Sequence, residues 1–217
     1  MNLAWKLALA VRGQAADGLL DSYHAERHPV GEEVVGRTVR SARAGIGIDQ
    51  TDLAMVMRRE AQLLVGYPDS PLVGEELTSS GLDGGPVPGQ RADDAGPLTQ
   101  DAVGYPVRLH SLLRHPGHTL VLWARDAAEL TRHEAIVSAL AVTVPSVHCY
   151  VIAAAEVSTE FSGRTLRDSE GGFADAYATS AVAAAAYLIR PDGYVGYRTD
   201  DPTAERILRH LRRTLAW

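Results

Sequence analysis

Cysteine and long apolar runs are scarce in this sequence. Its single cysteine, Cys149, excludes an intramolecular disulfide and a Cys-x-x-Cys redox pair. The neighbours of Cys149 are apolar and β-branched, which favours a small buried residue over a reactive thiol. No apolar run reaches the roughly 18 to 20 residues that cross a bilayer, and the N-terminus shows no cleavable leader pattern. These absences predict a soluble, cytoplasmic protein.

Motifs that bind nucleotides or activate nucleophiles are also missing. No Gly-x-Gly-x-x-Gly follows an apolar run, so the sequence offers no cradle for the pyrophosphate of a dinucleotide. No Gly-x-Ser-x-Gly marks a nucleophilic serine. We therefore predict no catalytic and no cofactor-binding residue in this chain.

The histidines could suggest a metal site. His24 and His28 are four residues apart, the spacing at which two helical side chains can hold zinc, but no third ligand is evident. His110, His115 and His118 cluster around a Pro-Gly turn, where surface histidines are the simpler interpretation. We predict no metal site.

The charge is modestly acidic. The formal net charge is −6, and acidic and basic residues are interspersed along the chain. Such a surface lacks the continuous positive charge that binds a phosphate backbone, so nucleic acid is not the expected partner. Protein or small-molecule partners are expected instead.

The first part of the chain, residues 1–62, is expected to be helical. Residues 2–11 carry apolar side chains on nearly every side of a helical wheel, which predicts a helix buried all round. Asp17 is the expected N-cap of a second helix, which should break or kink at His28 because the following proline disfavours helical geometry there. A third helix is expected near residues 51–61.

Residues 63–104 are rich in Gly, Pro, Asp and Ser, a composition that predicts an extended connector laid over other elements. The remainder, residues 105–217, is expected to form a compact domain. Apolar runs at 118–124 and 147–154 predict strands covered on both faces, the first followed by a helix that Asp126 caps.

The end of the compact domain has its own signals. A polar loop is expected at 158–172, then a hairpin whose turn is Arg-Pro-Asp-Gly at 190–193, and a final amphipathic helix at 202–216. The order strand, helix, strand, hairpin, helix predicts an α/β fold, with a small mixed sheet between helices.

Four separate stretches resemble, in the right order, the FAD-dependent aromatic hydroxylases that act on phenols and polyketides. In that family the first two close the flavin-binding domain and the last two belong to a thioredoxin-like C-terminal domain. The stretches are residues 1–8 (MNLAWKLA), 20–31 (LDSYHAERHPVG), 85–91 (GPVPGQR) and 187–195 (YLIRPDGYV).

The resemblance implies a thioredoxin-like mixed sheet flanked by helices, preceded by a helical segment from the end of a flavin-binding domain. The family's flavin motifs are not among the four stretches, so FAD and NAD(P)H are expected only for a full-length member. Residues 124–127, where a redox-active thioredoxin carries its cysteine pair, contain no cysteine. Glu26 and Arg27 match the family, and we interpret them as a local ion pair or a solvated face.

Two functions remain open. The first is a non-redox structural or oligomerisation portion of an FAD- and NAD(P)H-dependent aromatic-ring hydroxylase of the polyketide-tailoring kind, catalytically incompetent by itself. The second is a stand-alone thioredoxin-like binding or scaffold module that associates with itself or with a separate flavoprotein. Either way, the apolar helix that carries Trp5, Leu7 and Leu9 predicts a homodimer.

Overall fold

An eight-stranded mixed sheet forms the centre of the protein, with strand order β1-β8-β7-β4-β5-β6-β2-β3. The computed structural model describes residues 1–44, 53–79, 81–100, 103–157 and 165–217. The strands are β1 (Gly74–Glu76), β2 (Leu98–Gln100), β3 (Val103–Val107), β4 (Thr119–Ala124), β5 (His148–Ala154), β6 (Thr165–Asp168), β7 (Ala184–Ile189) and β8 (Val195–Thr199). The helices are α1 (Asn2–Val11), α2 (Asp21–Ala44), α3 (Leu53–Glu60), α4 (Leu109–Leu112), α5 (Ala127–Thr143), α6 (Gly172–Ala176) and α7 (Ala204–Leu211).

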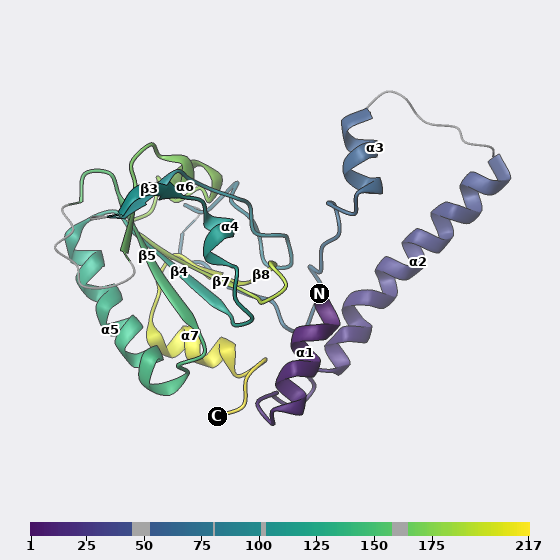
Figure 1. Ribbon diagram of the computed structural model, residues 1–217, viewed down its shortest axis with the longest axis horizontal. Coiled ribbons are helices and arrows are strands. Elements are labelled where there is room, and N and C mark those ends of the chain that lie inside the picture. The colour runs from purple at the N-terminus through teal and green to yellow at the C-terminus, as the bar shows by residue number, and fades with distance from the viewer. Residues whose placement is uncertain (45–52, 80, 101–102, 158–164) are drawn as a thin grey trace.

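The four inner strands β8, β7, β4 and β5 have the thioredoxin-like order. β4 and β5 are parallel and joined by α5, whereas β7 is antiparallel to both β4 and β8. Helices α5 and α7 pack on one face of the sheet, and α4 and α6 lie over the other (Figure 1). The predicted α/β class and the helix-flanked mixed sheet are confirmed.

The central strand β4 is apolar along its length because both of its faces are covered. All six of its residues are buried. Phe173 of α6 stacks near Trp123 from one side, at 6.0 Å between ring centroids, and Leu140 belongs to the same core. Helix α5 begins where predicted, since the Asp126 carboxylate accepts a hydrogen bond from the Glu129 amide at 3.0 Å.

The predicted hairpin is confirmed as well. Residues 190–193 turn between β7 and β8, and the Arg190 amide donates to the Tyr194 carbonyl at 2.8 Å. Gly193 supplies the left-handed backbone that the turn requires, with φ of +84°. The final helix is shorter than the predicted 202–216, because Thr203 caps it and α7 ends at Leu211.

Residues 63–104 contribute more than an extended connector. Their strand β1 pairs in parallel with β8, and their strand β2 pairs with β6, itself a strand inside the expected polar loop. Leu82 and Leu98 are fully buried in the sheet core. The composition did not predict these three- and four-residue strands, because they form by pairing with distant strands of the sheet and leave no local pattern in the sequence.

The N-terminal helices differ from expectation in two ways. α1 is not buried all round, since Leu7 is 43% and Val11 87% exposed. α2 begins at Asp21 rather than after Asp17, and it continues through Pro29, so the helix does not break there. Proline only disfavours helical geometry in the preceding residue, and the rest of the helix outweighs one lost hydrogen bond. The third helix is confirmed as α3, although residues 51 and 52 lie outside the described residues.

Two smaller points concern burial and length. Cys149 on β5 is half-buried and packs against the core, so it is less enclosed than predicted. Within the described part of the chain, every helix is too short or too polar to cross a membrane.

Candidate functional site

The best-connected polar cluster of the molecule surrounds Arg190, at the end of β7. Its guanidinium donates to the two carboxylate oxygens of Glu26 at 2.6 and 3.1 Å, and to Asp192 at 2.7 Å. The side chain of Arg190 is 1% exposed, and those of Glu26 and Asp192 are 0% and 2% exposed. This cluster, which we call the ionic junction, joins the second helix of the chain to the last hairpin.

Glu26 is the acceptor at the centre of the ionic junction. It also accepts from the Lys6 ammonium at 2.8 Å, from the Ser70 hydroxyl at 2.6 Å and from the Asn2 amide at 2.6 Å. The interpretation as a local ion pair or solvated face is therefore wrong for Glu26. The partners of Glu26 lie up to 164 residues away in sequence, and the carboxylate is sealed from solvent.

The charges of the ionic junction balance, because two cations, Lys6 and Arg190, face two anions, Glu26 and Asp192. Burial alone would raise the pKa of Glu26. The hydrogen bond and charge of Arg190, with the bonds from Asn2 and Lys6, outweigh burial and lower that pKa to about 2. The two carboxylates likewise raise the pKa of Arg190 above its ordinary value, against its burial. The pKa of Lys6 is lowered instead, because its burial outweighs the hydrogen bond and charge of Glu26.

Aromatic rings enclose the junction. The Arg190 guanidinium lies 5.4 Å from the Trp5 ring, 5.6 Å from Tyr67 and 5.9 Å from Tyr194. Trp5 also donates its indole N–H to Asp192 at 3.1 Å. A desolvated guanidinium gains from such ring contacts, which take the place of lost water.

His118 packs behind this aromatic shell. Its ring meets Trp5 edge-on at 5.5 Å between centroids, and the residue is only 3% exposed. Burial, with the nearby charge of Arg190, lowers the pKa of His118 to about 3. The prediction of a surface turn histidine is wrong for His118, whereas His110 and His115 are half-buried or exposed.

The third family-like stretch, residues 85–91, contacts the tyrosines that enclose the ionic junction. A Cβ on Gly89 would lie 2.5 Å from the Tyr67 backbone, and its φ of +89° also favours glycine. Two residues later, Arg91 forms an isolated bridge with Tyr194 and donates to its hydroxyl at 3.4 Å. All four stretches that resemble the hydroxylases therefore meet at the ionic junction.

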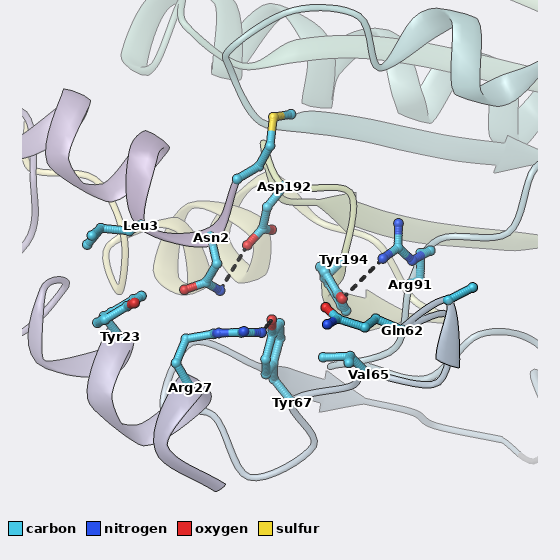
Figure 2. A pocket seen from close by; sticks show the side chains of 12 residues that line it. Asn2, Leu3, Tyr23, Arg27, Gln62, Val65, Tyr67, Arg91, Asp192 and Tyr194 are labelled. Atoms are coloured by element: carbon cyan, nitrogen blue, oxygen red, sulfur yellow. Dashed lines mark hydrogen bonds between the residues drawn. The ribbon is translucent and has the colours of Figure 1, made fainter. Parts of the chain in front are cut away.

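A polar pocket of about 570 Å³ opens beside the junction, between α1, α2 and the hairpin (Figure 2). Asn2 and Asp192 are hydrogen-bonded at its inner wall, at 3.1 Å. Arg27 and Arg91 point into the same region, each bound to a tyrosine hydroxyl. The pocket is large enough for a small aromatic molecule.

The two histidines of α2 contact each other. His24 and His28 lie with ring centroids 4.8 Å apart, and His28 pairs with Glu32 at 3.6 Å. No group of three or more metal-ligating side chains is found among the described residues.

Sequence reasoning missed the junction itself, although signals were present. Lys6 is a lone charge inside an otherwise apolar helix, and it is 0% exposed. A cation in such a stretch needs a buried anion, which could have directed attention to Glu26. Ser70 gave no such signal, because nothing in its Gly- and Pro-rich surroundings indicates burial.

The comparisons with known proteins find two family models on this chain. Residues 85–216 match the aromatic-ring hydroxylase C-terminal domain, and residues 1–38 match an FAD binding domain. Among curated proteins, the tetracenomycin B2 monooxygenase-dioxygenase of Streptomyces olivaceus is 33% identical over 216 residues, which cover 94% of this chain. The chain spans only 36% of that relative.

Two solved structures have similar folds. The aklavinone-11 hydroxylase, solved with FAD and aklavinone, is 27% identical with a TM-score of 0.60; the match covers 98% of this chain and 38% of that one. The flavin-dependent monooxygenase PieE, solved with FAD and substrate, has a TM-score of 0.65 at 24% identity and supports the fold alone. Its match covers 98% of this chain and 43% of that one.

Proposed function

Since the chain belongs to the aromatic-ring hydroxylases and corresponds to their C-terminal part, we propose that it is a structural portion of such an enzyme without catalytic residues of its own. Its role is to hold the thioredoxin-like sheet against the helices that close a flavin domain. The whole enzyme, in this proposal, hydroxylates an aromatic polyketide with FAD and NAD(P)H.

The ionic junction carries this proposal. Lys6 and Glu26 lie in the residues that match the FAD binding domain, whereas Arg190 and Asp192 lie in those that match the C-terminal domain. A balanced, desolvated set of four charges is costly to open, because separating it leaves ions buried without partners. Such a contact fixes the position of one domain on another, which is a structural role that requires no catalytic step.

The turn from the central strand β4 into α5 does not fit FAD. A dinucleotide pyrophosphate needs a glycine-rich turn between a strand and a helix, where amide groups face the phosphates. The turn from β4 into α5 holds the Asp126 carboxylate at the helix N-terminus instead, bonded to the Glu129 amide. An acid at that place repels a phosphate, so we assign the flavin to other parts of a full-length enzyme.

The exposed side of α1 and α2 supports the second part of the proposal, a protein partner. Leu7 and Val11 on α1 and Val35 on α2 are 43%, 87% and 63% exposed. Leu7 and Val11 are one helical turn apart, and neighbouring exposed apolar side chains mark contact surfaces. We propose that this side docks on a flavin domain, and that in its absence two copies associate through Leu7 and Val11 of α1. Trp5 and Leu9, which were expected on that surface, face inward instead, with Trp5 only 7% exposed.

Two measurements test the proposal. FAD is titrated into the purified chain and followed by flavin fluorescence, and NADPH oxidation is recorded with an added phenol. We expect no saturable FAD binding and no turnover; a yellow chain that oxidises NADPH would overturn the structural role.

Sedimentation tests the association. We expect a concentration-dependent dimer that Leu7→Glu dissociates, whereas Val142→Glu, an 85% exposed control position on α5, leaves it intact. A monomer at all concentrations would contradict the docking surface.

A further inference from the structure

We propose that the pocket beside the ionic junction binds a planar aromatic anion, such as an aromatic carboxylate. This site lies apart from any flavin chemistry and does not depend on the proposed structural role. The carboxylate would bind the Arg27 guanidinium, and the ring would lie against Leu3 and Tyr23, which lie on one side of Arg27 in Figure 2.

The first support is an excess of positive charge facing the pocket. Arg27 and Arg91 both line it, and neither has a carboxylate within salt-bridge distance among the described residues. The remaining charged side chain of the lining, Asp192, is already bound by Arg190 at 2.7 Å and by the Trp5 and Asn2 side chains at 3.1 Å. An entering anion therefore meets two available guanidinium groups and a neutralised carboxylate.

The second support is that both guanidinium groups are held in place. Arg27 donates to the Tyr67 hydroxyl at 3.2 Å, and Arg91 donates to the Tyr194 hydroxyl at 3.4 Å while lying 5.4 Å from that ring. The two tyrosine rings lie 4.6 Å apart at their centroids and are almost fully buried. Each arginine still has unused N–H donors, and its planar fork suits a carboxylate.

The third support is the polarity gradient along the pocket. In Figure 2, Leu3 and Tyr23 lie on one side, Arg91 and Gln62 lie on the other, and Arg27 lies between them. Leu3 and Tyr23 are 37% and 36% exposed, so apolar surface remains for a ligand to cover. A volume of about 570 Å³ exceeds the need of one substituted benzene ring and excludes large polymers.

Salicylate, its neutral isostere salicylamide, and acetate are the probes. Each is titrated into the full chain and followed by calorimetry and by saturation-transfer NMR. We expect salicylate to saturate one site, salicylamide to bind at least tenfold more weakly, and acetate to show no saturable binding. Equal binding of salicylate and salicylamide, or saturable acetate binding at the same strength, would overturn the proposal.

Variants locate the site. Arg27→Gln should weaken salicylate binding at least tenfold, and Arg27→Lys should weaken it less because the charge remains. Arg125→Gln removes an exposed arginine outside the pocket lining and should change nothing. Tyr23→Ala, at the exposed apolar side, should also weaken binding and provides a test if an arginine variant fails to fold. Unchanged affinity in folded Arg27→Gln or Tyr23→Ala would contradict this location.

Discussion

The sheet domain and the N-terminal helices are built on different principles. All six residues of β4 are buried, and the core around that strand extends through both faces of the sheet. By contrast, α2 runs away from the sheet (Figure 1), and its Val35 and Val39 are 63% and 41% exposed. The sheet is stabilised by many apolar contacts. The helices depend on a few residues near their beginning, and above all on the ionic junction.

This difference predicts where single substitutions act most strongly. Arg190→Met removes the one cation that binds both Glu26 and Asp192, and leaves their carboxylates buried with fewer partners. We expect a loss of about 3 to 5 kcal/mol in the free energy of unfolding, measured by urea denaturation. The loss should appear first as release of the helices, seen as faster hydrogen exchange in residues 2–30.

Arg132→Met is the matched control on the sheet domain. Arg132 is 52% exposed and pairs with Glu129 on the same helix at 2.9 Å. Solvent screens such a pair, so its loss should be far smaller than that of Arg190→Met. Similar losses for both variants would contradict the special role of the junction.

A second prediction concerns the close approach of two chain segments. Gly89→Ala places a methyl group 2.5 Å from the Tyr67 backbone and adds a side chain where φ is +89°. We expect a loss of about 1 to 3 kcal/mol from strain and displacement. Gly13→Ala shares the positive φ, at +66°, but has open space around the new methyl group, so it should cost less in the same denaturation experiment.

The same contrast explains how much could be predicted from the sequence. Strand β4, helix α5 and the hairpin were predictable because an apolar run, the cap Asp126 and the turn glycine Gly193 are local signals. Strand β6 was not, because its four residues form a strand only by pairing with β5 and β2. In the site, the motif around Glu26 was recognised but its burial was not, because burial depends on Arg190, 164 residues further along.

A further expected effect is a dependence of stability on pH. The pKa of His118 is lowered to about 3 in the folded protein, from an ordinary value of 6.5. As the pH falls from 6.5 to 3, the His118 imidazole therefore binds a proton in the unfolded chain but not in the folded chain. The free energy of unfolding decreases over that pH window. Replacing His118 should reduce the slope of the free energy of unfolding against pH by at most about 1.4 kcal/mol per pH unit.

His118→Phe is the variant for that measurement, with urea denaturation repeated between pH 4 and 7. Part of the slope should persist, because His210 is also buried and its pKa is also lowered to about 3. An unchanged slope in His118→Phe would show that His118 is accessible to protons in the folded protein and would weaken the description of a sealed junction.

The central claim is that Glu26 and Arg190 couple the N-terminal helices to the sheet domain. A double-mutant cycle with Glu26→Gln, Arg190→Met and the double variant measures that coupling in the free energy of unfolding. We expect the double variant to lose less than the sum of the single losses, by about 1 to 3 kcal/mol. Additive losses, within about 0.5 kcal/mol, would contradict the account, because they are typical of residues that do not interact.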